Sequence, residues 1–403
     1  MKILLIHNFM QSSAPSGEGV AFENDRRLLE RGGHEVFTYT RHNDSITKSL
    51  SSRTHAAISL FWSRSAYRDI AALIRQHRPD VAHFHNTFPL LSVSGYRACR
   101  AQGVPVIQTL HNYRLVCPAG LLTREGTPCF ECIDGSLLNS VRHACYRQSH
   151  VASGLVAAML AVNRGRGIYQ DDVDCYICLT ESARERFIRG GLPERKLTVR
   201  PNVLARPPAA GHGAGGYALF VGRLTPEKGP QTLVAAWEGI DYPLRIVGDG
   251  QLRDQLQQQC LRTGTRATFD GVRSPDQVAE LMREATFLVI PSECFEGFSI
   301  THLEALACGT PMIVSAIGAL DELIEAPANG LKFTAGDATD LRRAALELLR
   351  NEPARASMRT NNLALFERRY TPRRALEHIE GIYRSVIAST ALQATGGAPQ
   401  PLQ

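Results

Sequence analysis

A chain of 403 residues is longer than one hydrophobic core usually serves, so two domains are expected. Its 44% hydrophobic and 21% charged residues describe an ordinary soluble globular chain. No apolar run reaches the roughly 18 residues that suggest a membrane span, which argues against an integral membrane protein. The net charge of +6 is uneven, because residues 1–200 carry 25 Lys and Arg against 17 Asp and Glu, and the remainder carries 20 against 22.

The basic first half bears on the choice of partner. It could meet an anionic membrane surface or a phosphorylated acceptor, or it could be a solvated face with no partner. Nucleic acid is not expected, since no helix carries a dense basic stripe with interleaved aromatic residues. The opening "MKILLIHNF" reads as a buried strand and not as a secretory signal. We therefore expect a cytoplasmic protein, at the inner membrane face if a lipid surface is its partner, with cysteines that are mostly thiols or metal ligands.

Both halves of the chain alternate apolar runs with helical patterns, which is typical of doubly wound parallel sheets. We expect an α/β protein with two Rossmann-like domains. The expected strands are 2–7, 35–40, 80–85, 104–111 and 174–180 in the first half, and 217–222, 244–250, 267–271, 285–292 and 311–316 in the second. The helices expected in the second half include 227–238, 251–262, 276–284 and 337–350.

The segment 201–216, "PNVLARPPAAGHGAGG", predicts a linker between an N-terminal domain (1–200) and a C-terminal domain (217–370). Residues 371–388 are expected to form a helix that packs back on either domain, the N-terminal one included. The low-complexity tail 389–403 is expected to be disordered. Because open α/β sheets bind ligands at the carboxyl ends of their strands, we expect the chemistry in a cleft between the two domains.

The loop "VGRLTPEKG" (221–229) carries Arg223 and Lys228 directly after an expected strand. Two cations at a strand end could neutralise a diphosphate leaving group. A lone pair of basic residues on a loop is, however, usually plain surface. A role in binding a diphosphate is therefore expected only if a second feature of the sequence indicates the same ligand.

The stretch "PSECFEGFSITHLEALACGTP" (291–311) supplies that feature. A helix is expected to begin near residue 298, and the unpaired N–H groups at its start suit a phosphate. Glu304 lies deeper in the helix, where a carboxylate can accept hydrogen bonds from the vicinal hydroxyls of a ribose. Glu296 precedes the helix and could reach hydroxyls on the other side of the phosphates, which together describes a nucleotide sugar. The alternative is an ordinary turn glutamate and a solvated helix residue. The four N–H groups belong to Gly297, Phe298, Ser299 and Ile300.

Four blocks, "GRLTPEKG", "IVGDGQL", "PSECFEGFSITHLEALACGTP" and "NGLKFTAGDATDL", resemble the successive motifs of family four (group 1) retaining glycosyltransferases with the GT-B fold. The resemblance is close over residues 217–350 and looser in the N-terminal half. It implies an enzyme that moves a sugar from a UDP- or GDP-linked donor to a hydroxyl acceptor, without a metal for the chemistry. It also suggests a place in the synthesis of bacterial-type surface polysaccharide or glycolipid, where the acceptor can be lipid-linked.

The resemblance also implies roles for single residues. Arg223 and Lys228 would hold the diphosphate. Glu296 would contact the transferred sugar, and Glu304 the ribose. The backbone of Phe298, Ser299 and Ile300 would cradle the phosphate, and the loop with Gly271, Val272 and Arg273 would lie near the base.

In the first half, the loop "SAPSGEG" (13–19) would lie beside the donor phosphates and the acceptor by the same resemblance, so Gly17 and Glu18 are site candidates. An ordinary glycine turn is the alternative, and the loop is not a G-x-G-x-x-G dinucleotide fingerprint. In "QTLHNYR" (108–114), His111 follows a strand and matches a cleft histidine of the family, although a lone histidine is often structural. His85 is similarly placed.

Four cysteines lie in an insertion at 115–150 with the spacing C-x11-C-x2-C-x12-C. Four thiolates so spaced could form a structural zinc site that makes the insertion rigid. The alternatives are free thiols or, in an exported protein, disulfides. These residues are Cys117, Cys129, Cys132 and Cys145.

The segment 45–79 carries six Lys or Arg and places Leu60, Phe61 and Trp62 together. In the resembling family this region tends to face the acceptor. A peripheral membrane contact that serves a lipid-linked acceptor is one interpretation. A plain amphipathic helix is the other.

No nucleophile motif accompanies the two glutamates, and they are not recognisable as a glycosidase pair. This favours front-face transfer, in which the departing phosphate takes the proton of the acceptor hydroxyl. A catalytic metal at the nominal D-x-D of Asp172 and Asp174 is not expected. Two other classes stay open: a catalytically silent nucleotide-sugar-binding or scaffold protein, and a nucleoside-diphosphate-sugar epimerase.

Overall fold

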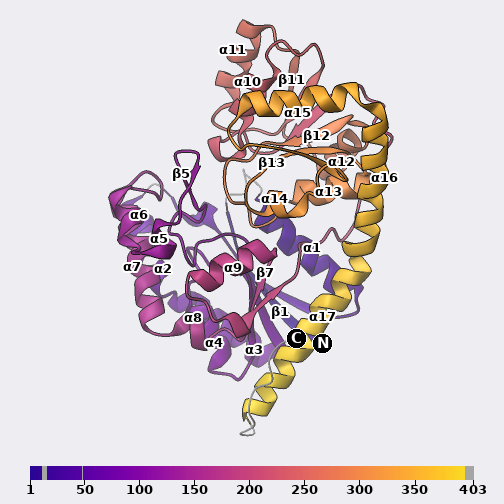
Figure 1. Cartoon of the computed structure of the whole chain (residues 1–403). Coiled ribbons are helices and arrows are strands. Elements are labelled where there is room, and N and C mark those ends of the chain that lie inside the picture. The colour runs from indigo at the N-terminus through magenta and orange to yellow at the C-terminus, as the bar shows by residue number, and fades with distance from the viewer. Residues whose placement is uncertain (11–15, 48, 395–403) are drawn as a thin grey trace. The chain divides into compact units, whose positions relative to one another are not determined.

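The structure is a computed structural model that describes residues 1–10, 16–47 and 49–394. The chain divides into two compact units (Figure 1). The first contains residues 1–122 and 130–205 and the chain from Pro372 onward. The second contains residues 123–129 and 206–371. Each unit is built around its own parallel sheet.

The first unit contains a six-stranded sheet in the order β2-β1-β3-β4-β7-β8, in which every neighbouring pair is parallel. Its central strands are apolar runs that are buried on both faces, as expected where helices cover both sides of a sheet. The strands are β1 (Lys2–Phe9), β2 (Glu35–His42), β3 (Val81–Asn86), β4 (Val106–Thr109), β7 (Cys175–Cys178) and β8 (Leu197–Val199).

The helices of the first unit differ widely in length, and the longest is the last. Helix α17 (Pro372–Ala394) adds Ile379, Ile382 and Tyr383 to the core formed by β1, β3, β4 and β7. No helix in the described part of the chain is long and apolar enough to cross a bilayer. The others are α1 (Gly17–Arg31), α2 (Leu50–Phe61), α3 (Arg64–His77), α4 (Ser94–Arg100), α5 (Glu131–Asp134), α6 (Leu138–Arg142), α7 (His150–Gly165), α8 (Ile168–Asp171) and α9 (Glu181–Arg189), with short 3-10 turns η1 (Asn43–Ser45) and η2 (Glu194–Lys196).

The second unit contains a six-stranded parallel sheet in the order β11-β10-β9-β12-β13-β14. In chain order this is 3-2-1-4-5-6, the arrangement of dinucleotide-binding Rossmann sheets, whose strand order reverses between the first and fourth strands. Here that reversal lies between β9 and β12. The strands are β9 (Ala218–Val221), β10 (Leu244–Val247), β11 (Ala267–Gly271), β12 (Phe287–Ile290), β13 (Met312–Ser315) and β14 (Gly330–Phe333).

The helices of the second unit begin and end at local signals in the sequence. Ser274 and Gln277 form a capping box at the start of α12, and Gly309 adopts a left-handed conformation (φ +72°) that ends α13. The elements are η3 (Pro226–Lys228), α10 (Pro230–Trp237), α11 (Arg253–Thr263), α12 (Pro275–Glu284), α13 (Ile300–Cys308), α14 (Gly318–Leu323), α15 (Ala338–Arg350) and α16 (Glu352–Arg369), and the hairpin β5 (Thr123–Arg124) and β6 (Thr127–Pro128) is grouped with this unit.

The expected fold class, two doubly wound parallel sheets, is confirmed. Each expected strand is present, and the sequence analysis missed the short outer strands β8 and β14. The expected linker segment contributes residues 206–216 to the second unit, where Gly211 N–H donates to the Cys308 carbonyl (2.9 Å). Residues 389–394 continue helix α17, and the rest of the expected tail lies outside the described residues.

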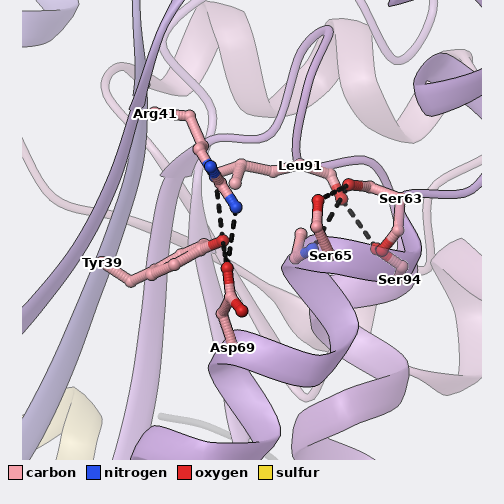
Figure 2. Close-up of polar contacts among 8 residues, drawn as sticks. Tyr39, Arg41, Ser63, Ser65, Asp69, Leu91 and Ser94 are labelled. Carbon is pink, nitrogen blue, oxygen red and sulfur yellow. Dashed lines mark hydrogen bonds and ion pairs between the residues drawn. The ribbon is translucent and has the colours of Figure 1, made fainter. Parts of the chain in front are cut away.

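Strand β2 is joined to helix α3 by a polar cluster (Figure 2). Tyr39 donates to a carboxylate oxygen of Asp69 (2.9 Å), and Arg41 pairs with the same oxygen (2.7 Å). At the start of α3, the Ser94 hydroxyl donates to the Ser63 carbonyl (3.0 Å). Figure 2 shows both sets of contacts flanking the first turns of α3, which fixes the point where α2 gives way to α3.

The first unit contains a buried ion pair between helix α1 and the segment after β8. Arg200 donates two hydrogen bonds to the carboxylate of Asp25, at 2.7 and 3.1 Å, and both side chains are almost fully buried. His85 Nε2 lies 3.7 Å from the same carboxylate. Breaking a buried pair leaves the remaining charge without compensation in a medium of low dielectric constant.

We therefore expect Asp25→Ala to lower the free energy of unfolding by about 3–5 kcal/mol, because it leaves the Arg200 guanidinium buried and unpaired. Urea denaturation followed by circular dichroism measures the change. The matched control is Arg26→Ala, one position along α1, where a partly exposed arginine pairs with Glu23 and Glu30. That control should cost less than about 1 kcal/mol. Equal costs for the two variants would contradict the prediction.

Candidate functional site

Two loops of the second unit leave neighbouring strands at the point where the strand order reverses. Strand β9 ends at Val221 and β12 at Ile290, and the two strands pair in parallel. Their following loops, 222–229 and 291–299, therefore emerge at the same edge of the sheet. Open α/β sheets bind ligands at this position.

The two loops are packed closely against each other. A Cβ on Gly229 would lie 1.9 Å from the Pro291 carbonyl oxygen, and the residue has a φ of +65°, so only glycine fits there. The Glu293 N–H also donates to the Glu227 carbonyl (2.9 Å). This packing places the last residue of η3, Lys228, next to the second loop.

Lys228 forms an ion pair with Glu296, and the Nζ–Oε1 distance is 2.8 Å. The Ser292 hydroxyl donates to the same carboxylate oxygen. Burial alone would raise the pKa of Glu296, but Lys228 and Ser292 outweigh it and hold that pKa below its ordinary value. Burial would likewise lower the pKa of Lys228, and Glu296 raises it instead. Both groups are therefore charged at neutral pH.

Arg223 lies on the first loop and is about half exposed. Its guanidinium pairs with Glu227 at 3.0 Å, one helical turn along the chain. An exposed pair of this kind is weak, so the cation can exchange partners at little cost. The structure thus gives this edge of the sheet one mostly buried cation and one accessible cation.

The second loop leads into helix α13. Ser299 caps the helix, and its hydroxyl accepts from the His302 N–H (3.2 Å). Among the described residues, the N–H groups of residues 297–300 have no hydrogen-bond acceptor. They are donors at the positive end of the helix dipole, which is an arrangement suited to an anion. These residues are Gly297, Phe298, Ser299 and Ile300.

Glu304 lies within α13 and contrasts with Glu296. Burial raises the pKa of Glu304 to about 7. Within the described ranges, no cation pairs with this carboxylate and no donor hydrogen-bonds to it. A half-buried carboxylate without a partner is costly, and donors on a ligand would relieve that cost.

The loop after β11 contains the remaining candidates of the second unit. Gly271 has a φ of +68°, and Val272 is largely exposed. Asp270 pairs with Arg245 (2.9 Å) and, at 3.6 Å, with Arg273. The loop therefore offers an exposed apolar side chain next to a paired arginine.

The first unit holds Glu18 and His111 in a polar network of its own. Asn86 donates to one oxygen of Glu18 (3.0 Å), and Asn112 to the other (2.5 Å). His111 Nε2 and His85 Nδ1 share a hydrogen bond of 2.9 Å. Burial, together with His7, His83 and Arg200, lowers the pKa of His111 to about 3, so the ring is neutral at pH 7. Gly17, which precedes Glu18 at the start of α1, has open space where a Cβ would lie.

A small pocket with a cavity volume of about 50 Å³, open to solvent, lies at the carboxyl ends of β3 and β4 in this unit. It is lined by polar side chains that include His85, Asn112 and Arg114 and by apolar ones that include Leu60 and Met159. His111 also lines it, so the histidine predicted from the sequence faces this pocket.

The four cysteines of the insertion do not form the zinc site that their spacing suggested. In the described residues no three Cys, His, Asp or Glu side chains are arranged to hold a metal ion. The thiols are distributed over a turn, the end of a short hairpin, helix α5 and the segment after α6. The described residues therefore give no support to the predicted zinc site. The four cysteines are Cys117, Cys129, Cys132 and Cys145.

Sequence reasoning missed Ser292. Its hydroxyl donates to Glu296, and its carbonyl accepts from the Ser315 hydroxyl of β13 (2.6 Å). The available signal was its position, directly after a buried strand and four residues before the glutamate. Without coordinates, that serine is indistinguishable from an ordinary strand end.

Two family models match the chain. "Glycosyl transferase 4-like domain" matches residues 16–203, and "Glycosyl transferases group 1" matches residues 212–364. Together they account for most of the chain. The two models follow one another along the sequence in the order of the two sheets.

Individual proteins agree with these matches. The chain is 27% identical over 360 residues to the 2-deoxystreptamine N-acetyl-D-glucosaminyltransferase of Streptomyces fradiae. This match covers 84% of this chain and 78% of that protein. It is 30% identical over 171 residues to an uncharacterized glycosyltransferase of Methanocaldococcus jannaschii, covering 42% of this chain and 48% of that protein. A second protein of that archaeon is matched over 30% of its length, so the chain spans less than half of either archaeal relative.

The fold is shared with solved structures. Alr3699/HepE of Anabaena, crystallised with UDP, superposes with a TM-score of 0.66 at 19% identity, covering 96% of this chain and 100% of that one. At this identity the likeness concerns the fold, which is the GT-B arrangement of two Rossmann-like domains.

The unpartnered Glu304 predicts an unusual dependence of stability on pH. Its folded-state pKa is raised, so the folded protein loses stability as the pH rises from about 4.5 to about 7 and the buried carboxylate ionises. We expect Glu304→Gln to raise the Tm by roughly 2–4 °C or more at pH 8 and to leave it unchanged near pH 4. Thermal melts of the ligand-free protein at both pH values check this. A lower Tm for the variant at pH 8 would show that Glu304 has a stabilising partner.

Proposed function

Because the chain belongs to the group 1 glycosyltransferases, retaining enzymes of the GT-B fold, we propose that it transfers a sugar from a nucleotide-sugar donor to a hydroxyl acceptor. The observation that carries the proposal is the Lys228–Glu296 pair at the strand-order reversal of the second sheet. It brings a fixed cation and an ionised carboxylate together beside unpaired helix N–H groups. A phosphorylated sugar needs these groups in one place.

In this proposal the diphosphate is held by the second unit. Lys228 is pre-positioned by Glu296, so little side-chain entropy is lost when a phosphate binds. Arg223 adds a second cation by leaving its exposed partner Glu227. The N–H groups of residues 297–300 donate to phosphate oxygens.

The two carboxylates take different hydroxyls. Glu296, held ionised by Lys228 and Ser292, accepts from hydroxyls of the transferred sugar. Glu304 accepts from the vicinal hydroxyls of the ribose, which would supply the donors that it lacks. The loop with Val272 and Arg273 contacts the base.

We favour uridine as the base. The Anabaena structures of the same fold contain UDP, UDP with glucose, or UDP-glucose. Guanosine is the alternative, and a thermal-shift panel with UDP and GDP distinguishes them.

The reaction that fits these residues is a front-face displacement. The acceptor oxygen forms a bond to the anomeric carbon on the face from which the diphosphate leaves, and the carbon–phosphate oxygen bond breaks. The proton of the acceptor hydroxyl passes to the departing phosphate oxygen, while Arg223, Lys228 and the helix N–H groups stabilise its negative charge. The family generally needs no metal for this chemistry. A trapped covalent glycosyl-enzyme would contradict the mechanism.

The first unit would serve the acceptor. Its pocket beside His111, with the neutral ring of that histidine and the Glu18 network, is our candidate for binding a hydroxyl-bearing acceptor. We propose a lipid-linked acceptor in the synthesis of surface polysaccharide or glycolipid, used on the cytoplasmic side of the membrane. Transfer assays with lipid-linked and soluble acceptors test this choice.

Two other functions predict different products. A catalytically silent binding protein would bind UDP or GDP without hydrolysing or transferring any donor sugar. An epimerase would isomerise the donor sugar without an acceptor. Product analysis with and without acceptor separates the three.

We expect Glu296→Gln to lower kcat/KM for transfer by about 10²–10³-fold, because the neutral amide is a weaker acceptor for the hydroxyls of the transferred sugar. Binding of the free nucleoside diphosphate, measured by calorimetry, should stay within a few-fold. The control is Glu280→Gln on the exposed face of α12, which should leave both quantities unchanged. Full activity of Glu296→Gln would rule out the proposed role.

Nucleotide binding should depend on the ionisation of Glu304. The ionised form accepts ribose hydroxyls, so the Kd for UDP should rise as the pH falls through about 7. For this group alone the rise between pH 8 and pH 6 is about tenfold. UDP itself titrates, so the Kd of the wild type is compared with that of Glu304→Gln at each pH. The variant should bind UDP more weakly, and its Kd should lack the tenfold rise that comes from Glu304. If the Kd for UDP changed with pH in the same way in the wild type and in Glu304→Gln, a contact between UDP and Glu304 would be excluded.

A further inference from the structure

Helix α7 of the first unit is apolar on two opposite faces. One face, with Val156 and Leu160, is buried in the unit. The other exposes Val151, Leu155 and Val162, with Val151 75% accessible to solvent. The exposed apolar positions 151, 155, 158 and 162 repeat at helical spacing and form one stripe along the helix. A helix that is apolar all round is normally covered on both faces.

Two neighbouring helices extend this stripe. Helices α6 and α2 both pack against α7, and Figure 1 draws the three along one edge of the first unit. Leu138 of α6 is 71% exposed, and Ile58 and Trp62, at the end of α2, are exposed as well. We call Ile58, Trp62, Leu138 and the α7 stripe the apolar edge. An exposed apolar surface of this kind marks an interaction site.

The charge around the apolar edge has one sign. Residues 45–68, which contain α2, have four Lys or Arg and no Asp or Glu. Residues 135–170, which contain α6 and α7, likewise have four Arg and no acidic residue. Among these, Arg142 and Arg166 are exposed at the two ends of the α6–α7 pair.

Several acidic residues border these two segments, and three of them are paired with arginines. Asp69 is paired with Arg41 (2.7 Å), as Figure 2 shows, Asp134 with Arg189 (2.6 Å) and Asp172 with Arg97 (2.5 Å). Glu131 lies 3.1 Å from His143 Nε2, and Asp44 and Asp171 are exposed. The two segments that carry the apolar edge therefore have an excess of cations, with a few acidic residues at their borders.

We propose that the apolar edge docks on the surface of an anionic lipid bilayer, with α7 lying in the interface and the arginines around it facing lipid phosphates. Apolar side chains in one line and an excess of cations on either side are the two features that bind an interfacial helix to such a surface. A protein partner would not require a basic border free of acidic residues over two separate segments. The contact involves no membrane-spanning helix, and it is independent of the donor chemistry.

The protein carries its own probe for this docking. It has two tryptophans, Trp62 in the apolar edge, 40% exposed, and Trp237, fully buried in the core of the second unit. A change in tryptophan emission on adding vesicles therefore reports on Trp62. We expect a blue shift with vesicles of phosphatidylglycerol and phosphatidylcholine (1:1), and little change with phosphatidylcholine alone.

Flotation with the same vesicles gives the affinity. The full chain should bind the anionic vesicles at least about tenfold more tightly than the neutral ones, and 0.5 M salt should reduce the difference. The double variant Val151→Asp/Leu155→Asp should bind about tenfold or more weakly. Arg142→Gln/Arg166→Gln should lose a similar factor on anionic vesicles and be unchanged on neutral ones.

The matched control is Leu261→Asp on α11 of the second unit, an apolar residue that is 83% exposed and lies outside the apolar edge. It should bind vesicles as the wild type does. All substituted side chains are exposed, and unchanged thermal melts will show that the variants are folded. Failure of the wild type to float with anionic vesicles overturns the proposal. So does a wild-type dimer in sedimentation velocity that Val151→Asp/Leu155→Asp converts to monomers, since the apolar edge would then join two copies of the chain.

Discussion

The ion pair between Lys228 and Glu296 joins the two loops that leave β9 and β12, and the rest of the candidate donor site depends on it. It forms because the strand order reverses between these strands and because Gly229 lets the loops approach to van der Waals contact. Each partner keeps the other charged in spite of burial. The pair thus fixes both the position and the protonation state of the groups around the start of α13.

The two glutamates of this region show how burial acts differently with and without a partner. Glu296 has a cation and a hydroxyl against it, so it is ionised at low cost. Glu304, about two helical turns further along the chain, has neither among the described residues, so burial raises its pKa. One carboxylate is satisfied by the protein. The other has no such partner among the described residues, at some cost in stability to the fold.

Much of this could be predicted from the sequence because strand order and loop position follow from apolar runs and glycines. The runs that became β9 and β12, and the glutamates after them, were visible in the motifs. The three residues of β8 and the four of β14 were too short to stand out. The opposite pKa shifts of Glu296 and Glu304 depend on three-dimensional neighbours, Lys228 above all and then Ser292. The cysteine spacing suggested a zinc site that the structure does not support, because spacing alone does not determine where short turns direct their side chains. The roles of all the candidate site residues stay predictions, those of Glu296 and Glu304 included.

Helix α17 completes a core that begins at the opposite end of the chain. Ile379, Ile382 and Tyr383 pack with Ile3 and Leu5 of β1, so the second unit is an insertion into the first. On the ribosome, the second unit is synthesised whole before the first can close. Part of the apolar interior of the first unit therefore stays uncovered until α17 has been translated. Its nascent form is the species that would need a chaperone.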